Sequence, residues 1–249
     1  MQVKRKGYNM KRKGYNMKGL KVYHLLVLVV MALCLVSTQA NAQLTYYFGY
    51  DSMFNPPLAG GTAPTGTWAT ATFTDVGGDV SLTLAVDSNL PGGQFIGEFF
   101  FNYSGDASLL HITDNGGDVN TTEIGQQNDF YQADGDGFYD IWFDFAPAGN
   151  NKLMAGESIN YTISGVSFSD FNFLSYNPGP GGNPGPFYAA AKLQGIPCGD
   201  VSDPDCQEGT TSAWSAGVVP EPVSSTLFLV GAATLGYRRF RKNKNKTIA

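Results

Sequence analysis

The chain has 249 residues and a formal net charge of −5, and it is rich in glycine (31) and in aromatic residues (17 Phe, 13 Tyr and 3 Trp). This length accommodates one ordinary domain with accessory segments, and the composition favours strands and turns over helices. Residues 43–219 contain two basic residues, Lys152 and Lys192, against twenty acidic ones, a net charge of −18. Nucleic-acid binding requires clustered Lys and Arg, so this distribution argues against a nucleic-acid partner.

Residues 1–42 have the organisation of an export signal. A basic stretch is followed by the apolar run LLVLVVMALCLV at 25–36 and by the small-residue pattern Ala40-Asn41-Ala42. This apolar run is too short to cross a bilayer, because a membrane-spanning helix needs about 20 residues. We therefore expect signal peptidase to remove residues 1–42 by cleaving between Ala42 and Gln43.

Short alternating apolar runs, separated by Gly, Asn, Asp and Pro, fill the chain from Gln43 onward. In VSLTLAV at 80–86, for example, every second residue is apolar and points to one face, as in a strand. The expected strands lie at 67–76, 80–86, 97–105, 138–146, 157–168, 169–176 and 187–196. Seven to nine strands without helical periodicity predict a single all-β domain at 43–214, an antiparallel β-sandwich similar to a jelly roll.

The end of this domain contains a loop, two cysteines and a polar stretch. YNPGPGGNPGP at 176–186 is too rich in proline for a central strand and predicts a long loop. Cys198 and Cys206 form an even pair in a chain expected to be exported, so we expect a disulfide bond between them. The small polar residues that follow are interpreted as a linker, assigned to 215–219, with the domain ending at Trp214.

The last 30 residues combine a Pro-Glu-Pro motif, an apolar span and a basic end. The span at 223–237 would form a helix of about 22 Å, shorter than the roughly 30 Å hydrocarbon core. Six basic residues follow at 238–246. The positive-inside rule places them in the cytoplasm and the preceding domain outside, which agrees with the export signal.

This order of motif, short span and Arg-rich end resembles the PEP-CTERM sorting signal of exported bacterial proteins. The resemblance covers residues 218–244, about a tenth of the chain. It implies that Pro220, Glu221 and Pro222 are read by an exosortase, a membrane-embedded enzyme similar to cysteine transpeptidases, which cuts at or near the motif. It also implies transient anchoring in the inner membrane through residues 220–246, then delivery to the cell surface or to an exopolysaccharide and biofilm matrix.

Catalytic patterns are sparse in the expected domain. His111 is the only histidine after the expected cleavage site, and a lone strand histidine is more often a packing residue than a member of a catalytic triad. No pair of carboxyl groups at the spacing of a glycosidase can be singled out from the sequence. We therefore expect no enzymatic activity.

One segment is a candidate cation site. DGDGFYD at 134–140 places Asp134, Asp136 and Asp140 as in the first half of a calcium-binding loop. However, Phe138 stands at the fifth position and the final Glu is absent. A plain Gly-Asp turn is favoured, no cofactor is expected, and Ca²⁺ stays open as an alternative.

Two aromatic residues are candidate sugar contacts. Tyr139 and Trp142 belong to the expected strand at 138–146, where an exposed ring can pack against a glycan. The leading interpretation is a non-enzymatic surface or matrix protein, structural or adhesive in exopolysaccharide. The alternative is a glycan-binding module, with or without calcium.

Overall fold

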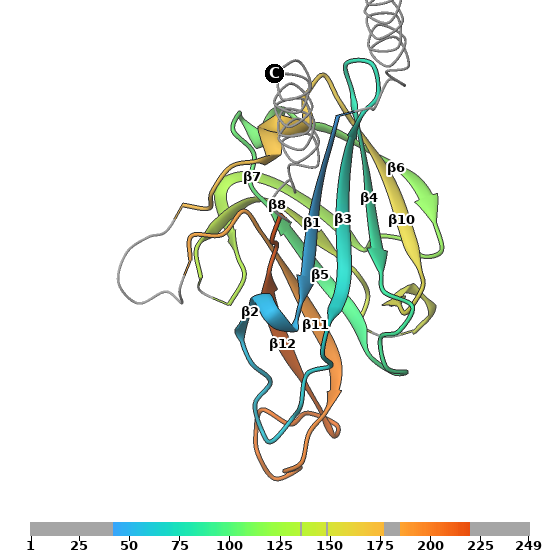
Figure 1. Cartoon of the computed structure of the whole chain (residues 1–249), viewed down its shortest axis with the longest axis vertical. Coiled ribbons are helices and arrows are strands. Elements are labelled where there is room, and N and C mark those ends of the chain that lie inside the picture. The colour runs from blue at the N-terminus through green and yellow to red at the C-terminus, as the bar shows by residue number, and fades with distance from the viewer. Residues whose placement is uncertain (1–41, 135, 148, 177–184, 220–249) are drawn as a thin grey trace, which may run out of the picture. The chain divides into compact units, whose positions relative to one another are not determined.

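A computed structural model describes residues 42–134, 136–147, 149–176 and 185–219 (Figure 1). In this part, the chain forms two antiparallel sheets joined by loops and short 3₁₀ turns, which confirms the predicted all-β sandwich class. The described residues include no helix long and apolar enough to cross a membrane. The expected sorting segment at 220–246, and the expected signal peptide up to residue 41, lie outside the described residues.

The first sheet has five strands in the order β1-β3-β4-β10-β6, and neighbouring strands are antiparallel. Its strands are β1 (Gln43–Gly49), β3 (Thr67–Asp75), β4 (Val80–Val86), β6 (His111–Gly117) and β10 (Ser158–Ser164). In β4 and β10 every second side chain is buried, as expected for strands with the core on one side and solvent on the other. The alternation in the sequence therefore reflects a one-sided sheet.

The second sheet has seven strands in the order β2-β12-β11-β5-β8-β7, with β9 paired to β5 beside this path. Its strands are β2 (Met53–Asn55), β5 (Phe95–Phe101), β7 (Glu123–Gln132), β8 (Phe138–Asp144), β9 (Leu153–Met154), β11 (Ala189–Pro197) and β12 (Thr210–Ala216). The 3₁₀ turns are η1 (Tyr50–Ser52), η2 (Ala107–Leu109), η3 (Gly149–Asn151) and η4 (Phe168–Phe171). Figure 1 shows the two sheets as separate layers.

The two sheets enclose an aromatic core. Phe73 of β3 lies edge-to-face against Phe101 of β5, with ring centroids 5.2 Å apart, and Phe101 meets Phe143 of β8 at 5.9 Å. Each such contact contributes about 0.5–1.5 kcal/mol beyond the area it buries. The core therefore connects the first sheet to two adjacent strands of the second and fixes the position of β5 and β8.

A β-bulge in β5 determines which of its side chains face outward. Lys192 of β11 pairs with Glu98, but the next residue, Leu193, pairs with Ile96, so Gly97 is the extra residue. A bulge interrupts the alternation of a strand. Ile96 consequently belongs to the core, whereas Glu98, two positions later, projects from the opposite face.

The region expected as a linker after Trp214 is instead part of the last strand. β12 continues through Ser215 to Ala216 and pairs with β11 and β2. Ser215 is fully buried, and its hydroxyl group accepts a hydrogen bond from the backbone N–H of Gly49 at 2.8 Å. Small residues stand here because the end of β1 passes close by. The expected domain end and the linker at 215–219 are therefore wrong.

The fold continues to Val218. The backbone N–H of Tyr47 donates to the carbonyl of Val218 at 2.9 Å, and the N–H of Val218 donates back at 3.0 Å. The N–H of Gly217 donates to the carbonyl of Ala189 at 2.7 Å. The last described residues are therefore bound to both sheets, to β11 through Gly217 and to β1 through Val218.

The segment 169–176, expected as a strand, contains most of the turn η4 instead. Ser167 and Asp170 form a capping box at the start of this turn, in which each side chain binds the backbone of the other residue. Phe171 then enters the core, and its carbonyl accepts a hydrogen bond from the hydroxyl group of Tyr46 at 2.8 Å. The local capping pattern outweighs the alternation that suggested a strand.

Cys198 and Cys206 form a disulfide bond, which confirms the prediction. Their Cα atoms are 5.8 Å apart, and the bond closes the loop between β11 and β12. This loop has no strand of its own apart from one isolated bridge, between Gln207 and Thr210. The disulfide therefore restricts a part of the chain that the sheets do not hold.

Replacing both cysteines, with Cys198→Ser and Cys206→Ser, is expected to lower the free energy of unfolding by about 2–3 kcal/mol, because the bond restricts the unfolded chain. Urea unfolding of the purified protein measures this difference. The exposed change Asp51→Asn, outside the loop, is the matched control and should leave the free energy of unfolding near that of the wild type. A double variant as stable as the wild type would contradict the prediction.

Candidate functional site

The candidate site lies on the outer face of the seven-stranded sheet, which is turned away from the core. Here strand pairing places six side chains in one row across β2, β12, β11, β5, β8 and β7. In this order the members are Asn55, Trp214, Lys192, Glu98, Asp144 and Glu123. Directly opposite residues in antiparallel strands have Cβ atoms about 4.5–5.5 Å apart, so each member lies within reach of the next. This set is called the outer-face row below.

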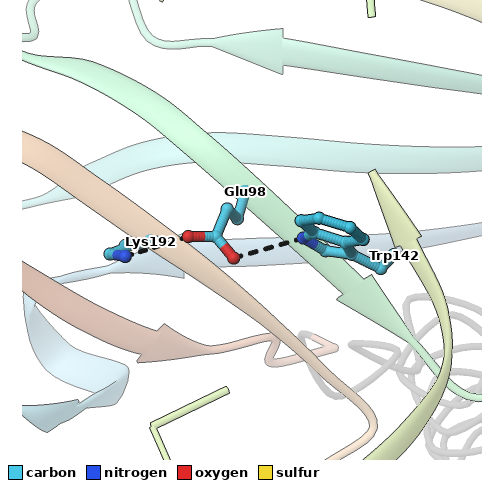
Figure 2. Close-up of polar contacts among 3 residues, drawn as sticks. All are labelled: Glu98, Trp142 and Lys192. Carbon is cyan, nitrogen blue, oxygen red and sulfur yellow. Dashed lines mark hydrogen bonds and ion pairs between the residues drawn. The ribbon is translucent and has the colours of Figure 1, made fainter. Parts of the chain in front are cut away.

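Glu98 binds two neighbours at once (Figure 2). Its Oε1 lies 2.9 Å from Nζ of Lys192 in an ion pair, and its Oε2 accepts a hydrogen bond from Nε1 of Trp142 at 3.2 Å. The Lys192 ammonium group also lies 5.0 Å from the ring centroid of Trp214, within the range of a cation–π contact. Glu98, Lys192 and Trp142 therefore hold one another in place.

Asp144 stands between two other acidic residues. It lies directly opposite Glu98 on one side and Glu123 on the other. Burial raises the pKa of Asp144 above its ordinary value, and the charges of Glu98 and Glu123 raise it further, while Lys192 lowers it. Like charges directly opposite each other destabilise a sheet. The row therefore has a cost in stability, which is a feature of functional sites.

Four aromatic rings form a ladder beside the row. The ring centroids of Tyr131 and Trp142 are 5.7 Å apart, those of Trp142 and Phe100 6.4 Å, and those of Phe100 and Trp214 5.7 Å. Gly125 makes room for this aromatic ladder, because a Cβ atom there would collide with the ring of Tyr131. Trp142 is half-buried, so part of its ring stays exposed, as a sugar-contacting residue requires.

The expectation of an exposed Tyr139 is wrong. Its side chain is fully buried, and its ring centroid lies 5.7 Å from that of Phe100. Its hydroxyl group donates a hydrogen bond to Oδ2 of Asp136 at 2.5 Å. Burial, together with the charge of Asp136, raises the pKa of Tyr139 well above its ordinary value. Tyr139 therefore holds the β7–β8 connection in place and presents no surface to a sugar.

Asp136 is fully buried as well. Within the described ranges, its Oδ1 has no hydrogen-bond partner. Burial raises the pKa of Asp136 from 3.8 to about 7, although the hydrogen bond from Tyr139 lowers it in part. This carboxyl group is therefore held in its neutral form at pH values where an exposed aspartate is ionised.

The three aspartates of the expected calcium loop are not brought together. Asp140 accepts hydrogen bonds from the backbone N–H groups of Tyr103 and Asp129, each at 2.8 Å, on separate oxygens. Asp134 accepts a hydrogen bond from the side chain of Asn55 instead. The described part of the chain contains no group of three or more His, Cys, Asp or Glu side chains placed to hold a metal ion. Calcium binding at this loop stays an open alternative to the plain Gly-Asp turn.

The sequence identified Trp142 but not the residues around it. Along the chain, Trp142 is 44 positions and Lys192 94 positions from Glu98, and only strand pairing brings them together. One signal for Lys192 was available in the sequence. Residues 43–219 contain twenty acidic residues and only two basic ones, so a basic residue there is expected to have an acidic neighbour. The expected sorting motif, Pro220 to Pro222, lies outside the described residues.

Comparison with known proteins adds no assignment. No protein-family model matches the chain, and no match was found among curated proteins or among solved structures. Function is therefore inferred from the residues and contacts described above.

The change Asp136→Asn is expected to make the free energy of unfolding less dependent on pH. The pKa of Asp136 is 3.8 ordinarily and about 7 in the folded protein, so the folded state binds the proton more tightly. The resulting stabilisation is complete below about pH 4 and is lost as the pH rises to about 7. Asparagine has no such proton, so stability should fall less over this interval.

Urea unfolding at several pH values between about 4 and 7 measures this slope. The exposed change Asp51→Asn removes the same formal charge elsewhere and should keep the slope of the wild type. If Asp136→Asn also keeps that slope, Asp136 does not take up its proton on folding and the prediction fails.

Proposed function

We propose that this chain is an exported protein delivered to the cell surface or extracellular matrix by its C-terminal segment. Signal peptidase removes residues 1–42, and residues 223–237 hold the chain transiently in the inner membrane. An exosortase then reads Pro220, Glu221 and Pro222. The processed β-sandwich serves as a non-enzymatic structural or adhesive component at the cell surface or in exopolysaccharide.

The observation that carries this proposal is where the sandwich begins and ends. Val218 is bound to β1, and the Pro-Glu-Pro motif starts two residues later, at Pro220. At the other end, β1 starts at Gln43, directly after the expected signal cleavage site. Cleavage at either place would remove none of the described strands. The two expected processing sites therefore lie outside the described strands, although the carbonyl of Ala42 accepts a hydrogen bond from the backbone N–H of Asp75 at 3.0 Å.

The disulfide bond and the charge distribution support export. Disulfide bonds persist in oxidising compartments and are rare in the cytosol, and Cys198 and Cys206 form one here. Basic residues gather at the two ends of the chain, whereas residues 43–219 have twenty acidic residues and two basic ones. This distribution fits an acidic domain outside the cell that is preceded and followed by segments with basic residues.

The outer-face row supports a role without catalysis. Glu98 and Asp144 are neighbours, and a retaining glycosidase uses two carboxyl groups about 5–5.5 Å apart. However, both oxygens of Glu98 already bind Lys192 and Trp142, so this carboxylate is poorly placed to attack a sugar. His111 lies on β6, in the other sheet. We therefore assign no catalytic residue.

Replacing Pro220, Glu221 and Pro222 with alanine is expected to stop processing, because the extended motif that the enzyme reads is lost. The unprocessed chain should accumulate in the inner membrane of the native host and be absent from the cell surface. Cell fractionation and the apparent size of the protein on an immunoblot measure both effects.

A matched control replaces Asp203 and Asp205 with alanine, in the exposed loop closed by the disulfide. This variant should be processed and delivered like the wild type. Normal processing and surface delivery of the motif variant would exclude the proposed sorting route.

A further inference from the structure

The outer face of the second sheet combines the acidic groups of the outer-face row, a lysine that already forms an ion pair, and the aromatic ladder. We propose that this face binds a linear polysaccharide with free amino groups, of the glucosamine type, lying across the strands. The inference rests on the geometry and the charge of the face. It does not depend on how the chain is delivered to the surface.

The shape of the face suits an extended polymer. The row crosses six neighbouring strands, from β2 to β7, and at about 4.8 Å per strand spacing it is about 24 Å long. This length accommodates several sugar residues in a line. A sugar ring has apolar C–H faces and polar edges, so a ring that packs on the exposed part of Trp142 brings its polar groups to the neighbouring row.

The charge of the face selects the chemistry of the ligand. The one ion pair among the described residues joins Lys192 to Glu98, and Lys152, the other lysine of residues 43–219, lies over the ring of Phe95. Within the described residues, Asp144 and Glu123 therefore have no ion-pair partner of their own. An ammonium group bound between these two carboxylates would remove their mutual repulsion. A polymer of uronic acids would add like charge to a domain whose net charge is already −18. Charge complementarity therefore favours an amino sugar.

The packing surface offered by Trp142 is fixed before any ligand binds. Glu98 is bound through both of its oxygens, and Trp142 is held by Glu98 and by its neighbours in the aromatic ladder. A site fixed in this way loses little conformational entropy on binding. Asp144 and Glu123 are then the groups that bind the ammonium group, and Trp142 is the surface on which the sugar ring packs.

Binding of soluble glucosamine oligomers to the full chain, purified in mild detergent, tests this proposal. The experiment is done at a pH at which the amino groups of the oligomer are protonated. We expect saturable quenching of tryptophan fluorescence and a rise in melting temperature, because a ligand that binds the folded state stabilises it. N-acetylated oligomers and uronic acid oligomers of the same length should give much weaker effects.

The variant Asp144→Asn separates binding from folding. It should bind glucosamine oligomers about tenfold more weakly, as expected for the loss of one hydrogen bond to a charged group. Its own melting temperature should be equal to or above that of the wild type, because a like-charge contact has been removed. The control Glu208→Gln removes the same charge in the exposed turn before β12 and should keep the affinity of the wild type.

Three results would overturn the proposal. Equal weakening in Asp144→Asn and Glu208→Gln would show unspecific attraction of a polycation to an acidic protein. Equal affinity for the N-acetylated oligomers would show that the amino group is not recognised. Absence of any saturable binding would exclude the site. Replacement of Pro220, Glu221 and Pro222 is tested by localisation and processing of the protein, so the outcome of that experiment is independent of these binding results.

A second variant, Trp142→Phe, tests the packing surface. Phenylalanine keeps an aromatic ring in the ladder. It removes the indole N–H group, which donates a hydrogen bond to Glu98, and it has a smaller ring area. Affinity for glucosamine oligomers should fall while the protein stays folded, as judged by a cooperative thermal transition. Unchanged affinity would exclude Trp142 as a contact and, with it, the binding mode proposed here.

Discussion

Strand β5 has to satisfy packing on both of its faces, and most of the structure depends on how it does so. Phe99 and Phe101 point into the core between the sheets, whereas Phe100 belongs to a second buried cluster on the outer face. These three residues alternate regularly, and the bulge at Gly97 changes the alternation once, before Glu98. If Gly97 were paired normally, Ile96 and Glu98 would face the same side. The bulge therefore lets Ile96 enter the core while Glu98 stays in the outer-face row.

The two faces of the second sheet are stabilised by different interactions. The inner face is a dense set of aromatic contacts that needs no polar partner, and it accounts for the position of the strands. The outer face combines an aromatic ladder with the Lys192–Glu98 ion pair and with Asp144, which has no salt bridge among the described residues. Such a combination is stable only if packing on the inner face contributes enough stabilising free energy to offset the repulsion between the acidic side chains. A strong core is thus what allows the sheet to carry acidic neighbours on its other side.

The sequence predicted the features that are encoded locally. The alternation at 80–86 identified β4, and an even pair of cysteines identified the disulfide bond. Strands β1, β2, β6, β7 and β9 lie outside the expected ranges. In β6, for example, seven mostly exposed polar and small residues, HITDNGG, form an edge strand without an apolar face. Strand β12 was missed because close packing against β1 selects small residues, which also occur in linkers.

The candidate site was less predictable than the fold, because it arises from register. Nothing in the local sequence shows that Glu98, Lys192 and Trp142 meet, since three strands must be paired before they do. Tyr139, in contrast, was expected to be part of the site and is buried instead. No residue of its strand is exposed, and a register shift between β7 and β8 interrupts the regular pairing before Tyr139. Simple alternation from the buried Ile141 and Phe143 already argued against an exposed Tyr139.

The bridge between Tyr47 and Val218 has a mechanical consequence for a chain held by its C-terminal end. A pull on that end reaches the sandwich at Val218, where two backbone hydrogen bonds to β1 carry the load first. The hydrogen bond from Gly217 to Ala189 passes the load on to β11, in the other sheet. Tension that starts at β1 would therefore spread to both sheets through adjacent residues of the chain.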